Sequence, residues 1–321
     1  MGKPSEQVKN GKAFEYAILS QYVIYLRSVG VNVSVVENAA YETAKLFFEE
    51  QTQEQRERYE ESAKATIETI IKLEPGLVSP KNEQDVLLAS LAIDSEGRQG
   101  DVRDIIFERT HSQWEVGFSA KNNHEAVKHS RLSNQIDFGK LWLGKPCSQQ
   151  YWNNVLPVFD LILDYKNQGL DWNRVPNKTS DIYLPLLNAF RIEMLRLCQG
   201  DSEAPANLVR YLIGKYPFYK IIKEDRYNLV VVKAFNIEGQ LNKRLNGATP
   251  RYKTPKLNLP HRIVEFELKP GSETTLVMIL DEGWEISFRI HNAESRIVPS
   301  LKFDIQLLGN PPILFTQHLF Q

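Results

Sequence analysis

The stretch GDVRDIIFERTHSQWEVGFSAKNN, residues 100–123, decides the fold expected of this 321-residue chain. It holds two short runs of apolar and β-branched residues, DIIFE (104–108) and WEVGFSA (114–120), joined by a polar segment. Such runs on either side of a short polar loop are typical of a β-hairpin. The expected hairpin starts after Asp101, at Asp104, and finishes on Lys121, so its two ends carry opposite charges.

Side chains alternate between the two faces of a strand. In the second run, Ser119 and Lys121 share one face and lie about 7 Å apart, whereas Glu115 is about 20 Å from Lys121 and is excluded from the same site. If the two strands pair as an antiparallel hairpin, Asp104 and Lys121 meet at one edge of the sheet. The other face of the second strand, expected to be the core face, consists of Trp114, Val116, Phe118 and Ala120.

An aspartate beside a lysine at a sheet edge has a defined chemical use. A carboxylate is a hard oxygen ligand suited to Mg²⁺, and a nearby ammonium can orient water and offset charge on a phosphate. The pair therefore suits metal-assisted hydrolysis of a phosphodiester. The alternative is a surface hairpin with ordinary charged ends.

The rest of the chain predicts an α/β fold. Helical spacing of apolar residues predicts helices over 11–30, 37–50 and 53–74, and a short apolar run predicts a strand at 86–93. Residues 122–144 and most of 150–216 also have helical patterns. Short β-branched and aromatic runs then follow to the end. We expect a boundary near residue 216, with parts 1–216 and 217–321, or else one continuous fold.

The overall composition says little about binding partners but indicates the cellular compartment in which the protein is expected. The net charge is −1, so binding of nucleic acid must come from local charge. The two cysteines, Cys147 and Cys198, predict a reducing compartment and no zinc site. No apolar segment has the length of a signal peptide core or a membrane span, so we expect a soluble, cytoplasmic protein with no membrane partner.

Several long strings resemble one family. GDVRDIIF and the following WEVGFSAKNNHEAVKHSRLS resemble HaeIII-type type II restriction endonucleases, as do GKAFEYA (11–17), TPRYKTPKLNLPHRIVEFE (249–267) and WEISFRIHNAESRIVPSLKFDIQLLG (284–309). The resemblance touches segments over nearly the whole chain. It implies a Mg²⁺-dependent enzyme that cleaves double-stranded DNA at GGCC, beside a cognate methyltransferase in a restriction–modification system.

The same resemblance implies a PD-(D/E)XK nuclease-like core, with a mixed sheet flanked by helices, a helical middle segment and a β-rich C-terminal region. That superfamily carries an Asp at the start of one strand and an acid-x-Lys on the next. Asp104 matches the first element and Lys121 the last, but Ser119 replaces the usual acid. The resemblance therefore implies that Asp104 binds Mg²⁺ with help from Asp101 or from Glu15, in the first helix.

Positive charge suited to DNA phosphates and to guanine edges gathers in three places. Residues 239–262 contain no acid and include Lys243, Arg244, Arg251, Tyr252, Lys253, Lys256 and Arg262. The segment after Lys121, expected to be helical, offers Asn122, His124, Lys128 and Arg131. The segment 284–296 offers Arg289, His291, Asn292 and Arg296. Sequence alone does not rank them as base readers or phosphate contacts.

Two other functions stay open. The first is a repair or recombination nuclease of the same superfamily that recognises DNA structure. The second is a DNA-binding module without activity, which the serine at position 119 allows. A palindromic target favours a homodimer, although a monomer that nicks each strand in turn would also serve.

Overall fold

The computed structural model describes residues 5–93, 101–123, 127 and 130–320 and divides the chain into two compact units. Unit 1 comprises residues 1–125, 214–257 and 313–321, and unit 2 comprises residues 126–213 and 258–312. One crossing between the units, at residues 213–214, lies close to the boundary expected near residue 216, and the others fall at 125–126, 257–258 and 312–313. The chain crosses between the units more than once, because strands near both ends of the sequence pair into the sheet of unit 1.

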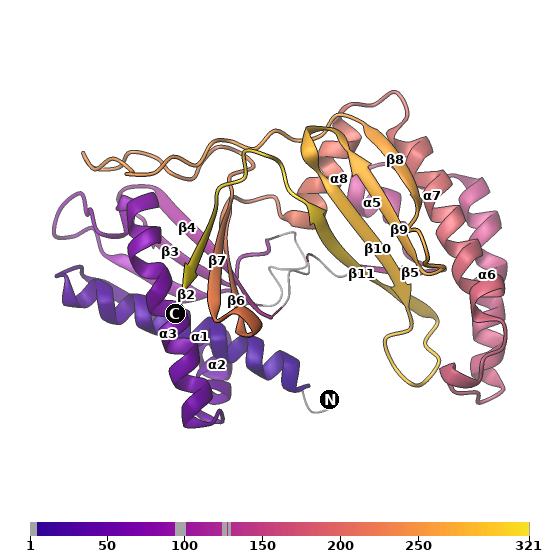
Figure 1. The fold of residues 1–321 in the computed structure, drawn as a ribbon, viewed down its shortest axis with the longest axis horizontal. Coiled ribbons are helices and arrows are strands. Elements are labelled where there is room, and N and C mark those ends of the chain that lie inside the picture. Colours follow the sequence, from indigo (N-terminus) through magenta and orange to yellow (C-terminus); the bar gives the residue numbers. More distant parts are fainter. Residues whose placement is uncertain (1–4, 94–100, 124–126, 128–129, 321) are drawn as a thin grey trace. The chain divides into compact units, whose positions relative to one another are not determined.

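Unit 1 is a seven-stranded mixed sheet with helices packed on it (Figure 1). The strand order is β1-β2-β3-β4-β6-β7-β12, with β1 parallel to β2 and β4 parallel to β6. This confirms the expected mixed sheet with flanking helices. The helices are α1 (Glu6–Ser28), α2 (Ala39–Glu49) and α3 (Gln53–Leu73), and the strands are β1 (Val33–Val36), β2 (Leu87–Leu91), β3 (Ile105–Arg109), β4 (Trp114–Asn122), β6 (Phe218–Glu224), β7 (Leu229–Phe235) and β12 (Thr316–Phe320).

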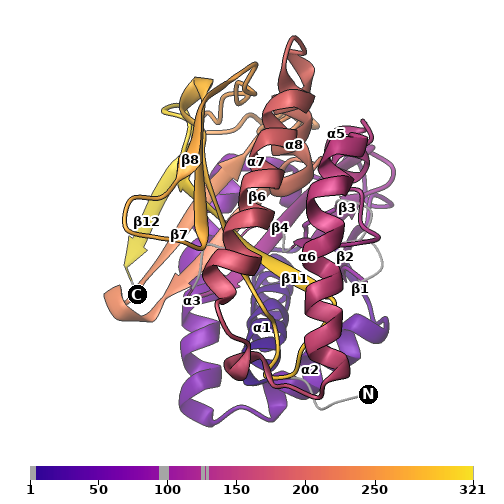
Figure 2. The same ribbon diagram turned by 90° about the vertical axis from the view of Figure 1, so that its right-hand side faces the viewer.

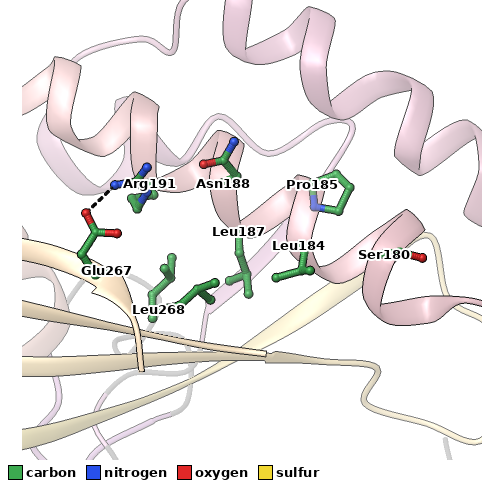
Figure 3. Close-up of a pocket in the computed structure, with 9 residues that line it drawn as sticks. Ser180, Leu184, Pro185, Leu187, Asn188, Arg191, Glu267 and Leu268 are labelled. Atoms are coloured by element: carbon green, nitrogen blue, oxygen red, sulfur yellow. Dashed lines mark hydrogen bonds and ion pairs between the residues drawn. The ribbon is translucent and has the colours of Figure 1, made fainter. Parts of the chain in front are cut away.

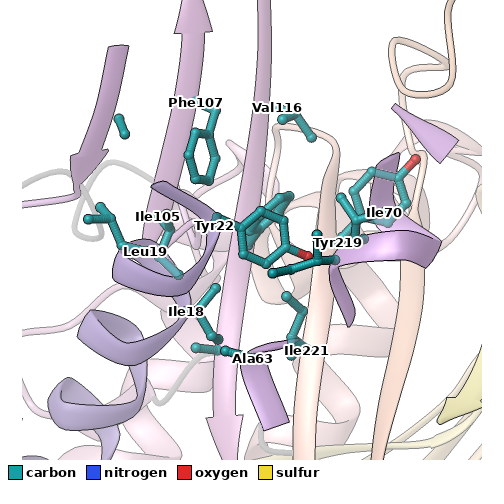
Figure 4. Close-up of a cluster of buried hydrophobic side chains, with 14 of the residues drawn as sticks. Ile18, Leu19, Tyr22, Ala63, Ile70, Ile105, Phe107, Val116, Tyr219 and Ile221 are labelled. Atoms are coloured by element: carbon teal, nitrogen blue, oxygen red, sulfur yellow. The ribbon is translucent and has the colours of Figure 1, made fainter. Parts of the chain in front are cut away.

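Local signals in the sequence explain the helix ends. The Ser5 hydroxyl caps α1, and Thr52 with Gln55 forms a capping box that starts α3. The apolar stripe of α1 then packs on the sheet, where the rings of Tyr22 and Phe118 lie 5.2 Å apart (Figure 4). This packing fixes α1 relative to β4, and α1 also carries Glu15, which matters for the site described below.

Unit 2 is an antiparallel five-stranded sheet, in the order β5-β11-β10-β9-β8, with helices on one face (Figures 1 and 2). Trp142 and Phe190 pack from these helices against Phe288 and Phe303 of the sheet. The helices are α5 (Phe138–Leu143), α6 (Gln149–Asn167), α7 (Leu184–Cys198) and α8 (Glu203–Ile213), and the strands are β5 (Ser130–Ser133), β8 (Ile263–Leu268), β9 (Thr275–Leu280), β10 (Glu285–His291) and β11 (Ser300–Gly309).

One secondary-structure prediction is wrong. Residues 122–144 were expected to form a helix, but the described part holds strand β5 and only the short helix α5. The reason is a long-range pairing, since β5 is held by β11, about 170 residues further along the chain, and its Leu132 is buried in the core. Strands β1 and β12 were also not predicted.

Among the helices of the described residues, none is both long enough and apolar enough to cross a membrane.

Candidate active site

The β3–β4 hairpin brings the expected charged groups together. The strands pair antiparallel, with Ile105 opposite Phe118, and the Asp104 amide donates to the Phe118 carbonyl at 2.7 Å. Asp104 therefore lies at the head of β3, beside the last residues of β4. Ile105 and Phe107 of β3 and Trp114, Val116 and Phe118 of β4 are buried, which fixes this register because a slip by one residue would move them to the other face.

The Asp104 carboxylate is held by three donors from β4. Its Oδ2 atom accepts from the Ala120 amide at 2.8 Å, the Ser119 hydroxyl at 3.1 Å and the Lys121 ammonium at 3.2 Å. The side chains of Asp104 and Lys121 are 21% and 23% exposed, so the pair remains accessible. All three donors contact Oδ2, so Oδ1 is the atom better placed to meet a ligand.

Glu15 of α1 belongs to the same electrostatic cluster. It is buried and accepts from the Lys12 ammonium at 3.1 Å, one turn earlier on the helix. The pKa of Glu15 is raised to about 8, chiefly by burial and next by the negative charge of Asp104, while Lys12 and Lys121 act in the opposite direction. Two carboxylates and two ammonium groups therefore influence one another directly.

Asp101 does not contact Asp104 or Lys121 but is bound by Arg103. Both of its carboxylate oxygens accept hydrogen bonds from Arg103, at 2.7–3.1 Å, and Arg103 also binds Glu115 at 2.8 Å. The Arg103 side chain runs over Gly117, where a Cβ atom would clash with it at 2.0 Å, and its guanidinium stacks over the Tyr216 ring. Asp101 is thus neutralised by an arginine, and Glu115 also lies in this separate network.

Ser119 has an orienting position. It is buried and its hydroxyl points to Asp104 rather than to solvent. The hydroxyl therefore helps to fix the orientation of the Asp104 carboxylate.

The donor set fits Mg²⁺ better than a metal that needs many protein ligands. No group of three or more His, Cys, Asp or Glu side chains that could hold a metal occurs in the part of the chain that the structure describes. Mg²⁺ is commonly bound by one or two carboxylates together with waters and substrate phosphates. Asp104 and Glu15 provide two, and their mutual repulsion favours a cation.

The basic segment after β7 forms an ordered, exposed loop in unit 1. Asn242 organises it: its side-chain amide donates to the carbonyls of Leu73 and Tyr252, and its backbone amide donates to Glu74 at 2.6 Å. The predicted DNA-binding side chains of this loop are all exposed, and none has an ion-pair partner among the described residues. They are Lys243, Arg244, Arg251, Tyr252, Lys253 and Lys256.

The other predicted DNA-binding residues are distributed over both units. Asn122, at the end of β4, donates to the Tyr59 hydroxyl at 3.2 Å. His124 and Lys128 lie outside the described residues. In unit 2, Arg131 lies on β5 and is exposed, and the remaining group comes from β10 and the segment that follows it. That group consists of exposed Arg289 and Arg296 and half-buried His291 and Asn292.

Two residues near these sites were not singled out from the sequence. Lys12 contacts Glu15, and its spacing of three residues on a helix was a usable signal. Glu74, at the end of α3, is buried and binds both the basic loop and the Tyr219 hydroxyl, at 2.7 Å. The local sequence carried no signal for Glu74, because its partners come from distant segments.

A pocket in unit 2 does not resemble an active site. It measures about 420 Å³ and lies between α7 and strands β8 and β9 (Figure 3). Its walls include Leu184, Leu187 and Leu268. Arg191 and Glu267 also line it and form an ion pair, with 2.8 Å between Nη1 of the arginine and Oε1 of the glutamate. A single ion pair on an apolar wall lacks the cluster of carboxylates and ammonium groups found around Asp104.

Comparisons with known proteins agree with the geometry. The family model of the HaeIII restriction endonuclease matches residues 11–311. The type II restriction enzyme HaeIII of Haemophilus aegyptius is 39% identical over 303 residues, which cover 94% of each chain. No solved structure matches the chain. The chain therefore belongs to the HaeIII family of restriction endonucleases.

Proposed function

We propose that this protein is a type II restriction endonuclease that hydrolyses double-stranded DNA in the presence of Mg²⁺ at a short palindromic site, GGCC. The observation that carries the proposal is the three-donor arrangement around Asp104, with Lys121 at 3.2 Å and Glu15 in the same electrostatic cluster. Membership of the HaeIII family supports the reaction class, and the resemblance of the sequence to that family implies the GGCC target. The cognate methyltransferase would be a functional partner.

The residues around the site have separate roles in this reaction. Asp104 and Glu15 would hold Mg²⁺, which would supply Lewis acidity and a coordinated water of lowered pKa. The Ala120 amide and the Ser119 hydroxyl hold Asp104 in a fixed orientation. Asp101, which the sequence also suggested as a ligand, is assigned here to the Arg103 network.

Lys121 has the most direct role in catalysis. Its ammonium lies on the same strand face as Ser119 and reaches the Asp104 carboxylate. From there it can position a water and stabilise the negative charge that develops on the phosphate oxygens. Water then attacks in line with the leaving 3′ oxygen. The buried Ser119 hydroxyl is an orienting group, so no covalent intermediate is proposed.

The mixed sheet and the Asp104–Lys121 pair also support placement in the PD-(D/E)XK nuclease superfamily. Its usual second acid is replaced by Ser119, and we propose that Glu15 of α1 takes over that charge. A homodimer would match the two-fold symmetry of a palindromic target.

The proposal is tested by digestion of a plasmid of known sequence with Mg²⁺, with EDTA as control, followed by mapping of every fragment end. We expect discrete fragments that all end within GGCC and no cleavage in EDTA. Discrete fragments that end at another sequence would reject GGCC as the target but not the restriction activity. Cutting confined to branched or nicked substrates would indicate a structure-selective nuclease, and binding without cutting would indicate an inactive module.

A further inference from the structure

Three neighbouring strands of unit 2 place a basic side chain in one row across the sheet. Lys302 of β11 lies opposite Arg131 of β5 on one side and opposite His291 of β10 on the other. Residues directly opposite one another in a sheet project from the same face. We call Arg131, Lys302 and His291 the cationic row.

The row points away from the core of unit 2. The sequence neighbours of its members, Leu132, Phe303 and Ile290, are all buried, and Phe303 packs against the helical layer. Because successive side chains alternate, the row projects from the opposite face. Arg131 is exposed, and Lys302 and His291 are half-buried, so an external ligand can reach them.

None of the three residues of the cationic row is acidic. Like charges directly opposite one another destabilise a sheet. The carboxylate of Asp304 lies in the next row, opposite Arg289. Neither Arg131 nor Lys302 has an ion-pair partner among the residues that the structure describes. An anionic ligand would offset the like charges of Arg131 and Lys302, which lie directly opposite each other.

The orientation of two members is already fixed. The Arg131 guanidinium donates to the Ser300 hydroxyl at 2.9 Å, and His291 Nδ1 lies 2.9 Å from the Asn292 carbonyl. Side chains that are held in place lose less conformational entropy when they bind a ligand.

We propose that the cationic row contacts the phosphate backbone of duplex DNA, an inference that rests on the proposed function. The strands are about 4.8 Å apart, so the row spans roughly 10 Å. One DNA strand carries a phosphate about every 3.4 Å along the helix axis, so the row is long enough to contact more than one phosphate. Lys302 at its centre is a residue that the sequence did not single out.

The test measures binding of wild type and variants to duplex DNA in Ca²⁺, by fluorescence anisotropy over a series of salt concentrations. The variants are Arg131→Gln, Lys302→Gln and the double change. Lys166→Gln is the matched control, because Lys166 is exposed on α6, a helix of the same unit that packs on α7. Circular dichroism checks that each variant is folded, and Lys302→Arg, which keeps the charge, separates charge from packing.

We expect each single change to lower the salt slope, d log K/d log[salt], by about 0.9 and the double change by about 1.8. The loss should be equal for a GGCC duplex and a scrambled duplex, while Lys166→Gln and Lys302→Arg keep the wild-type slope. Unchanged slopes in both single variants would overturn the inference. A loss confined to the GGCC duplex would also overturn it, because it would indicate base reading. If wild type itself neither binds nor cuts DNA, the proposed function fails instead.

Discussion

Replacing Glu74 by glutamine should change how the stability of this protein depends on pH. Glu74 follows α3, is 1% exposed, and accepts hydrogen bonds from the Tyr219 hydroxyl and the Asn242 amide. Burial raises its pKa to about 7. A glutamine oxygen can accept the same two hydrogen bonds, but it never carries the charge. The change therefore removes the titration and keeps the contacts.

The sign follows from proton binding. The folded state holds the Glu74 proton up to about pH 7, whereas the unfolded chain releases it near the ordinary value of 4.5. The free energy of unfolding of wild type should therefore fall as pH rises through this window, and the loss should be complete above pH 7. The two pKa values correspond to a loss of about 3 kcal/mol. Glu74→Gln should lack this loss.

The assay is urea unfolding of wild type and Glu74→Gln in EDTA at pH 5, 6, 7 and 8. The stability of the variant relative to wild type should increase by about 2.5 kcal/mol from pH 5 to pH 8, because the rest of the loss falls below pH 5, and the m-value should be unchanged. Glu61→Gln, at an exposed position of the same helix, is the control. A difference between Glu74→Gln and wild type that is constant with pH would refute the reasoning.

Three further changes test other parts of the structure. Arg103→Met leaves Asp101 buried without its cation and should lower the free energy of unfolding by about 3 kcal/mol in urea; an unchanged midpoint would contradict the assigned network. Ser119→Ala removes one of three donors to the Asp104 carboxylate, so single-turnover cleavage should fall by less than about tenfold; complete inactivity would make the hydroxyl essential. The double change Arg251→Gln and Lys253→Gln should lower the salt slope of DNA binding by about 1.8; an unchanged slope would show that the basic loop does not contact DNA.

The central hairpin could be predicted because its information is local. Two apolar runs and one short loop determine β3 and β4, and strand alternation then places Asp104, Ser119 and Lys121 on one face. The exclusion of Glu115 from that site also follows from strand geometry, and the structure places it with Arg103. Helices α1 and α3 had equally local signals, in their apolar spacing and capping residues.

Features that depend on distant partners could not be predicted. Strand β5 has the composition of a helix end, and only its pairing with β11 makes it a strand. The same pairing brings Arg131 and Lys302 together in the cationic row. These residues are far apart in the sequence, so the row could not be predicted from it. The repeated crossing between the two units could not be predicted for a related reason, because β12 returns to the sheet of unit 1 from the end of the chain.

The most direct test of the proposed active site is single-turnover cleavage of a GGCC duplex by Asp104→Asn and Lys121→Met in Mg²⁺, beside binding of the same duplex in Ca²⁺. Each change should lower the cleavage rate by at least about a hundred- to a thousandfold, the loss typical when one preorganised electrostatic group is removed from an active site. Binding should remain within a few-fold of wild type. Cleavage by either variant at close to the wild-type rate would contradict the assignment of Asp104 and Lys121 as catalytic residues.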